Sequence, residues 1–252
     1  MASYTIVKEK WEESQLKEYY KNSKSNFNLD SWDDLDIIFN TAIKNPGLFP
    51  GINGIKTVPD YIERWVKCYH DATLNPPSER IATPKTACTD PAIRLIVQTT
   101  QNMDINSAIE GELIHNLYMN AENIQGNLLE EYISIHIRKY GFLWCKGNIL
   151  RAIDFCSSDG KILLQIKNKS NTENSSSSHI RTGTTIKKWY RLGTKTENKK
   201  KVPKYNWEKL NNLVDEYKTE GKNLEKCNLS ESSYLEFIKK VSLNNKSLIT
   251  NE

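Results

Sequence analysis

The spacing of hydrophobic and polar residues changes along the chain, from helical to strand-like and back to helical. Helical spacing dominates the first hundred residues. Pro59 at the start of one such segment and Ser31 before another are typical of helix N-termini. We therefore expect helices at 32–45, 59–72 and 91–101.

A longer helical pattern covers 107–141, with a possible break near Gly126 and an end at Gly141. Strand-like spacing follows it, and two further helical segments follow Lys204. The expected strands are 142–144, 149–155 and 161–167, and the expected later helices are 206–218 and 232–241.

This order of elements indicates an α/β (α+β) fold, with a mixed central sheet flanked by helices. The length of 252 residues suits one domain with helical additions better than two independent domains. We expect a single domain over 1–252. Its parts are a helical N-terminal part (1–105), a core (106–205) and C-terminal helices (206–252).

Net charge changes this picture because it is unevenly distributed. The chain carries +4 in total, but 179–204 holds nine Lys or Arg and one acid, Glu197. Such a segment can attract a polyanion. A solvated loop is the favoured interpretation for Lys199 to Lys201. Contact with nucleic acid is favoured for Arg181, Lys187, Lys188 and Arg191, which alternate with hydroxyl and aromatic side chains such as Thr184, Thr185, Trp189 and Tyr190.

Several classes of protein are disfavoured by what the sequence does not contain. No apolar run is long enough for a membrane span, and the N-terminus lacks the apolar core of a signal peptide, so we expect a cytoplasmic protein without membrane contact. The five cysteines form no CxxC pair, which argues against disulfide or zinc frameworks. No Gly-rich phosphate loop, GxSxG or HExxH motif is present.

The candidate chemistry lies in the expected hairpin. Asp154 ends one apolar run, Ser157 to Gly160 supply a turn, and Lys167 follows in a second run. Alternation along that run places Gln165 and Lys167 side by side on one face. An acidic residue and a lysine on neighbouring strands are typical of a nuclease active site.

Phosphodiester hydrolysis needs an activated water and charge stabilisation on the phosphate, and a divalent metal held by carboxylates supplies both. We expect Asp154 to bind Mg²⁺ directly, and Lys167 to position or deprotonate the water. Gln165 stands where a second carboxylate is expected and offers only a neutral oxygen. Glu130 can supply the missing charge, since it shares a helix face with Ile133 and Ile137 that should pack on the sheet.

Structural interpretations of the same residues remain open. Glu130 and Glu131 can both face solvent. Asp154 can be a turn residue and Lys167 an exposed charge on an edge strand. Three histidines, at 70, 115 and 136, are expected to be structural, whereas His179 lies in the basic segment, where DNA contact is plausible.

A family resemblance rests on Ala152-Ile153-Asp154, on Leu164-Gln165-Ile166-Lys167-Asn168-Lys169, and on the run SNTENSSSSHIRTGTTIKKWYR. With these motifs the chain resembles the PD-(D/E)XK superfamily, and within it Type II restriction endonucleases of the SinI type. The resemblance covers about 126–192. Asp154 and Lys167 match the superfamily's metal ligand and catalytic lysine, whereas Gln165 departs from the usual Glu or Asp, which puts metal number and affinity in doubt.

The resemblance implies a Mg²⁺-dependent homodimer that cuts both strands of double-stranded DNA at a short palindrome of the GGWCC or GGNCC type. It also implies a cognate DNA methyltransferase. Guanine is best recognised by Arg or Lys in the major groove. The expected DNA-binding residues are Lys169, Ser175, Ser176, Ser177, Ser178, His179, Arg181, Thr184, Thr185, Lys187, Lys188 and Arg191.

Two alternatives stay beside this hypothesis. The first is a repair or structure-specific nuclease of the same superfamily, which would cut many sequences or junctions. The second is a non-catalytic nucleic-acid-binding protein, in which the hairpin is only structural. For Ser175 to Ser178, a flexible linker is an alternative to DNA contact.

Overall fold

A computed structural model of the chain describes residues 4–6, 11–82, 90–169, 186–217 and 224–249. Three helices form the N-terminal part: α1 (Glu13–Ser25), α2 (Asp33–Lys44) and α3 (Val58–Leu74). The α2 and α3 helices were expected, and α1 was not. Helix α3 starts where the sequence indicates, because Thr57 accepts a hydrogen bond from the backbone N–H of Asp60 and Pro59 lies in the first turn.

The N-terminal helices surround an aromatic core that continues into the sheet. Phe39, Phe49 and Trp65 pack against one another with ring centroids 5.7 to 6.4 Å apart. The same buried cluster includes Leu143 and Leu163 from two strands. The N-terminal helices thus share one hydrophobic core with one side of the sheet.

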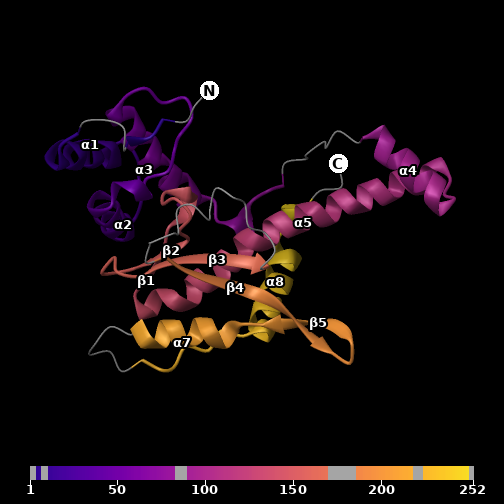
Figure 1. Cartoon of the computed structure of the whole chain (residues 1–252). Coiled ribbons are helices and arrows are strands. Elements are labelled where there is room, and N and C mark those ends of the chain that lie inside the picture. Colours follow the sequence, from indigo (N-terminus) through magenta and orange to yellow (C-terminus); the bar gives the residue numbers. More distant parts are fainter. Residues whose placement is uncertain (1–3, 7–10, 83–89, 170–185, 218–223, 250–252) are drawn as a thin grey trace.

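Helices α4 (Pro91–Gln101) and α5 (Ile105–Ile137) form a hairpin, and α5 runs from its far end to the sheet (Figure 1). Asp104 starts α5 by accepting hydrogen bonds from the N–H groups of Asn106 and Ser107. The predicted break at Gly126 is wrong, because one interior glycine costs a helix only about 1 kcal/mol. The predicted end is confirmed: a short 3-10 turn, Arg138–Tyr140, leads to Gly141 at φ +91°.

Five strands form one sheet in the described residues: β1 (Phe142–Trp144), β2 (Phe155–Ser157), β3 (Leu163–Lys169), β4 (Ile186–Glu197) and β5 (Lys200–Tyr205). The strand order follows the chain. Neighbours are antiparallel except β3 and β4, which are parallel. The mixed sheet flanked by helices is an α+β fold, as predicted.

The strand expected at 149–155 is wrong over most of its length, since only its last residue belongs to β2. The backbone before Asp154 is bonded to the N-terminal part instead. Trp65 Nε1 donates to the Ile149 carbonyl at 2.7 Å, and the Arg151 N–H donates to the Leu48 carbonyl at 2.7 Å. Ala152 has a φ of +59°, which no strand accommodates.

In the basic segment a solvated loop was expected at Lys199 to Lys201, but only Lys199 lies in a turn. Lys200 and Lys201 belong to a strand, and so do the residues from Ile186 to Glu197. Strands β4 and β5 form a hairpin there, joined by Asn198 and Lys199, which both have positive φ. The segment contains β-branched and aromatic residues at strand spacing, and its many lysines concealed this signal. Its side chains therefore have fixed directions.

The C-terminal helices were predicted and are confirmed as α7 (Trp207–Tyr217) and α8 (Glu231–Asn244). With α5 they cover the other side of the sheet, where a second buried cluster contains Ile133, Leu164 and Trp189. None of the helices described is both long and apolar enough to cross a membrane. The sheet therefore lies between two hydrophobic cores.

Candidate active site

Asp154 lies directly before β2 and is held by three hydrogen bonds. Its N–H donates to the Leu164 carbonyl at 2.9 Å, and its carbonyl accepts from the Cys145 N–H at 2.8 Å. Its carboxylate accepts from the Ile166 N–H at 2.6 Å. The predicted turn after β2 is confirmed, with Gly160 at φ +72°. The carboxylate of Asp154 is thereby fixed beside the second half of β3.

Glu130, from α5, approaches the same place. Trp144 Nε1 donates to its carboxylate at 3.2 Å. Burial and the negative charge of Asp154 raise the pKa of Glu130 to about 8. Burial also raises the pKa of Asp154 to about 6, against the opposing effect of the Ile166 hydrogen bond and Lys167. Two carboxylates that repel each other in partly buried surroundings are a site where a cation lowers the energy.

Gln165 and Lys167 occupy the same side of β3, as the alternation predicted. Their neighbours Leu164 and Ile166 enter the core beneath α5, whereas Leu163 enters the N-terminal core. Gln165 is only 3% exposed, and its Oε1 has no hydrogen-bond partner among the described residues. A buried, unsatisfied amide oxygen suits a hard cation such as Mg²⁺.

Within the described part of the chain, the candidate site has two carboxylates, those of Asp154 and Glu130. No group of three or more His, Cys, Asp or Glu side chains in that part is placed to hold a metal. Mg²⁺ commonly binds proteins through one or two carboxylates and keeps several waters. Asp154, Glu130 and the Gln165 oxygen are therefore a donor set that fits Mg²⁺.

Comparison with known proteins assigns the chain to a family. Residues 67–241 match the family model of the SinI restriction endonuclease, and this range contains the whole candidate site. The chain belongs to this family. It is 34% identical to the Type II restriction enzyme Eco47I of Escherichia coli over 184 residues, which are 71% of each protein.

A second relative is the Type II restriction enzyme SinI of Salmonella infantis. It is 35% identical over 161 residues, which are 62% of this chain and 66% of SinI. Membership of the SinI family makes the chain a Type II restriction endonuclease, a site-specific deoxyribonuclease. The family model leaves out residues 1–66, which include α1 and α2.

In this SinI-family enzyme the two neighbouring glutamates have different surroundings. Glu131 lies on another face from Glu130, as its position indicated, but that face is not exposed. Its carboxylate accepts hydrogen bonds from the N–H of Ser78 at 2.8 Å and from the Ser78 hydroxyl. The open alternative of two solvent-facing glutamates is therefore wrong.

Strand β4 places the predicted DNA-binding residues on two opposite sides of the sheet. Lys188 is paired with Gln165, and Tyr190 with Lys167, so these side chains share the side of the candidate site. The Lys188 ammonium lies 4.8 Å from the Tyr190 ring centre. Lys187 is exposed and lies on the opposite side of the strand.

Arg191 lies on that opposite side too. It donates to Asn168 Oδ1 at 2.9 Å and forms an ion pair with Glu231 of α8, and both charged side chains are largely buried. This arginine links the sheet to α8. Lys169 is exposed and forms a 2.8 Å ion pair with Glu122 of α5.

The remaining predicted DNA-binding residues lie outside the described residues. They are Ser175, Ser176, Ser177, Ser178, His179, Arg181, Thr184 and Thr185.

Two residues near the site were not predicted. Trp144 holds Glu130 through its indole N–H, and its place at the end of a predicted strand was the available signal. Arg80 is exposed, and its positive charge lowers the pKa of Glu130. No sequence pattern indicates Arg80, because it follows a short 3-10 turn far from the motif.

Proposed function

We propose that the chain hydrolyses both strands of duplex DNA with Mg²⁺, at a short palindrome of the GGWCC or GGNCC type, through a PD-(D/E)XK site. The observation that supports this most is the arrangement of Asp154, Glu130 and Lys167 at the end of the β2–β3 hairpin. Each carboxylate interacts electrostatically with the lysine.

Each residue has a defined part in this reaction. Asp154 and Glu130 hold the metal through carboxylate oxygens, and Gln165 adds its neutral oxygen. Bound Mg²⁺ supplies charge stabilisation and a more acidic water. Lys167 hydrogen-bonds the attacking water or takes its proton, and its positive charge stabilises the phosphate as negative charge develops.

We assign recognition of the DNA sequence to the side of the sheet that carries Gln165 and Lys167. Lys188 extends that side by one strand, and Arg80 flanks it near Glu130. Both add positive charge where a phosphate backbone must pass. A palindromic target implies a twofold homodimer, in which each copy cuts one strand. A cytoplasmic location and a cognate methyltransferase belong to the same proposal.

The test is cleavage of defined duplexes. Matched DNAs carry GGACC, GGGCC or a scrambled sequence, and each is incubated with Mg²⁺, with Ca²⁺ or with a chelator. We expect Mg²⁺-dependent cuts on both strands within GGACC, and the GGGCC duplex distinguishes the two types of site. Sequencing of the ends gives the cut positions.

Two variants test the assigned roles. Asp154→Asn and Lys167→Met should each lower the cleavage rate at least ~100-fold, because the first removes a carboxylate that would hold the metal and the second removes the group that acts on the water and the phosphate. Lys161→Met is the matched control, because Lys161 is exposed on the turn after β2. Cleavage of all duplexes alike, or full activity of either site variant, would contradict the proposal.

A further inference from the structure

The α4 helix and the first half of α5, residues 90–119, extend away from the rest of the molecule (Figure 1). We call this segment the arm. Its two helices meet through polar side chains: Arg94 of α4 and Glu112 of α5 form a 2.8 Å ion pair, with 24% and 19% of their side chains exposed. No residue of α4 is buried. Between the two helices only Ala108 is buried among the described residues of the arm, so the hairpin has almost no apolar core of its own.

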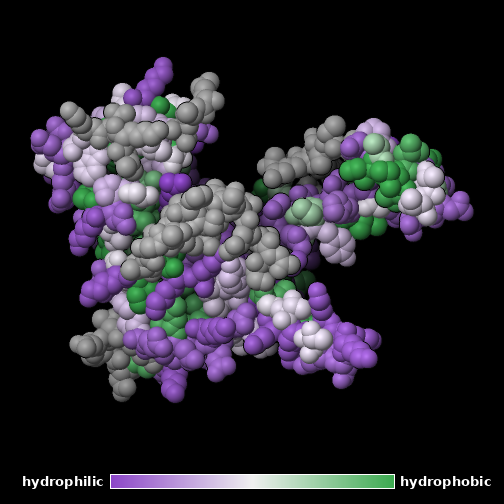
Figure 2. All heavy atoms as spheres, in the orientation of Figure 1, coloured by the Kyte–Doolittle hydropathy of each residue, from purple (hydrophilic) through white to green (hydrophobic). Residues whose placement is uncertain are grey.

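Most of the large apolar side chains of the arm are exposed. Figure 2 shows hydrophobic residues gathered over its end. Leu95 and Ile96 on α4 are 63% and 62% exposed, and Leu113 on α5 is 57% exposed. Exposed apolar residues recur along both helices: Ile93, Leu95, Ile96, Val97, Met103, Ile105, Ile109, Leu113, Ile114, Tyr118 and Met119. Large exposed apolar side chains gathered in this way mark a site where another macromolecule binds.

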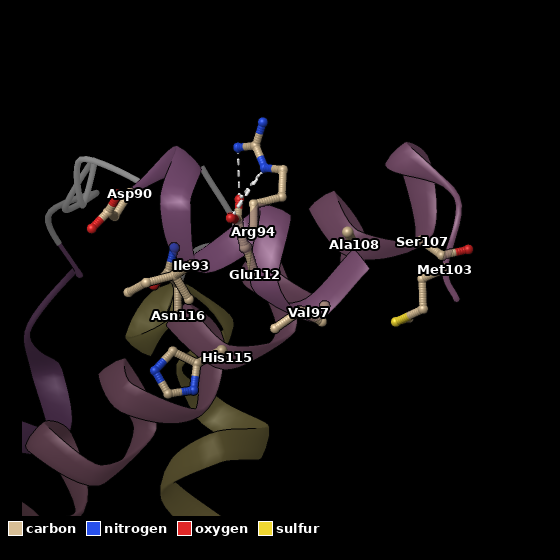
Figure 3. Close-up of a pocket in the computed structure, with 11 residues that line it drawn as sticks. Asp90, Ile93, Arg94, Val97, Met103, Ser107, Ala108, Glu112, His115 and Asn116 are labelled. Atoms are coloured by element: carbon tan, nitrogen blue, oxygen red, sulfur yellow. Dashed lines mark hydrogen bonds and ion pairs between the residues drawn. The ribbon is translucent and has the colours of Figure 1, made fainter. Parts of the chain in front are cut away.

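A groove between the two helices adds shape to this surface. It has a volume of about 520 Å³, and its walls include Ile93, Val97 and Met103 (Figure 3). The Arg94–Glu112 pair lies at one side of the groove and leaves its apolar wall free. Side chains from a facing helix can enter such a groove, as they do in helix bundles.

Charge argues against DNA as the partner. The arm contains one arginine, Arg94, against four carboxylates, Asp90, Asp104, Glu110 and Glu112. A polyanion is repelled by this surface. The partner must therefore present apolar side chains.

We propose that the arm is the dimerisation surface, and that its partner is the arm of a second copy of the chain. A stable protein interface takes about 800 Å² from each partner. Eleven large apolar side chains, each between 36% and 69% exposed, supply an area of that order. Two hairpins related by a twofold axis would bury these side chains in an intermolecular four-helix arrangement.

This inference rests on the proposed function, because two cuts in a palindrome require two copies of the Asp154 site. It goes further in assigning the contact to the arm. The candidate site and the basic β4 strand stay uncovered in such a dimer, since they lie at the other end of α5.

The test measures the mass of the full-length protein without DNA, by sedimentation velocity over a wide range of concentrations. We expect the wild type to sediment as a dimer of the 29.1 kDa chain. Ile96→Glu and Leu113→Glu should each weaken association at least ~100-fold, because a twofold interface contains every substituted residue twice. Leu243→Glu on α8 is the control, since Leu243 is 58% exposed outside the arm.

Circular dichroism and thermal unfolding at low concentration show whether the arm variants fold. Folded variants that remain dimeric would overturn the assignment to the arm, and so would a wild type that is monomeric at every concentration. Where a variant does not fold, concentration-dependent amide hydrogen exchange of the wild type decides. The protection of backbone amides in residues 90–119 must then rise with protein concentration.

The outcome is separable from the nuclease proposal. An arm-dependent dimer that cuts no DNA would refute the proposed function and leave the dimerisation surface standing. An active nuclease whose dimer is insensitive to arm substitutions would refute the surface and leave the proposed function standing. Mass without DNA and cleavage of DNA are independent measurements.

Discussion

Adjacent residues on α5 illustrate how one position along a helix changes the role of a side chain. Glu130 faces Trp144 and the charge of Asp154, and Glu131 faces Ser78. One carboxylate is in an unfavourable electrostatic environment that a cation would relieve. The other satisfies a backbone N–H and has its charge stabilised by hydrogen bonds.

Substitution of the two glutamates should therefore have opposite effects. Glu131→Ala should lower the free energy of unfolding by about 1 to 3 kcal/mol, because the Ser78 N–H loses its partner. Glu130→Gln should leave the stability of the metal-free protein unchanged or raise it, while cleavage is lost. Urea unfolding with a chelator present measures both. Equal destabilisation by the two substitutions would contradict the assigned surroundings.

The raised pKa of Glu130 also predicts a pH dependence. Its pKa moves from 4.5 to about 8 on folding. Between these values the folded state holds a proton that the unfolded state has released, so stability falls as pH rises through this window. Glu130→Gln removes this contribution. Without metal, the difference in unfolding free energy between the variant and the wild type should increase in favour of the variant from pH 5 to pH 8. Chemical unfolding at several pH values measures this difference. A constant difference across the window would refute the prediction.

At the scale of elements, β4 converts a run of basic residues into two chemically different faces. Lys188 and Tyr190 lie on the side of Gln165 and Lys167, and Lys187 and Arg191 lie on the other. Trp189, between them, is buried in the core beneath α7. In a loop, these side chains would not be divided between two faces of a sheet.

This division predicts unequal contributions to DNA binding. Lys188→Ala should weaken binding and reduce the slope of binding against salt concentration by about 1, as loss of a phosphate contact does. Lys187→Ala, its neighbour on the opposite face, should change the slope less. Fluorescence anisotropy in Ca²⁺ at several salt concentrations compares them. Similar losses from both lysines would show that both sides of β4 contact DNA.

The sequence predicted most of the helices with regular apolar spacing, although α1 was missed, and it failed where the backbone bonds to residues that are remote in sequence. Helices α2, α3, α7 and α8 have clear apolar stripes and were found. The chain before Asp154 is as apolar as a strand, but it is bonded to Trp65 and Leu48, which are remote in sequence. Local periodicity carries no information about such partners.

The candidate site was likewise predictable only where its residues follow from local sequence patterns. The shared side of Gln165 and Lys167 follows from a two-residue period, the candidacy of Asp154 from its place before a turn, and that of Glu130 from a helix face. Arg80 and Ser78 come from a turn about fifty residues earlier, and only the folded chain brings them to α5. Contacts of this range depend on the packing of whole elements.

At the scale of the molecule, the N-terminal helices contribute to the site without supplying a candidate catalytic group. They fix the segment that precedes Asp154, through the bond from Trp65 to the Ile149 carbonyl and through the burial of Ile149, Leu150 and Ile153. The position of Asp154 therefore depends on a core centred on α3.

Removal of the hydrogen bond from Trp65 to the Ile149 carbonyl tests whether the N-terminal core positions Asp154. Trp65→Phe keeps an aromatic ring but leaves the buried Ile149 carbonyl without its donor, which should cost about 1 to 3 kcal/mol of stability. It should also slow cleavage at temperatures where the protein is fully folded. Trp32→Phe is a control on a half-buried tryptophan at the same core. Unchanged cleavage by folded Trp65→Phe protein would show that Asp154 is held by β2 and β3 alone.

The long helix α5 has a consequence for the product of the reaction. It carries apolar residues of the arm near one end and Glu130 near the other, and roughly 25 Å of helix separates Leu113 from Glu130 at a rise of about 1.5 Å per residue. In an arm-to-arm dimer this length, together with the angle between the two copies, would set the distance between the two scissile phosphates. The number of unpaired bases left at each cut end would then be determined by helix geometry as much as by the sequence that the enzyme recognises.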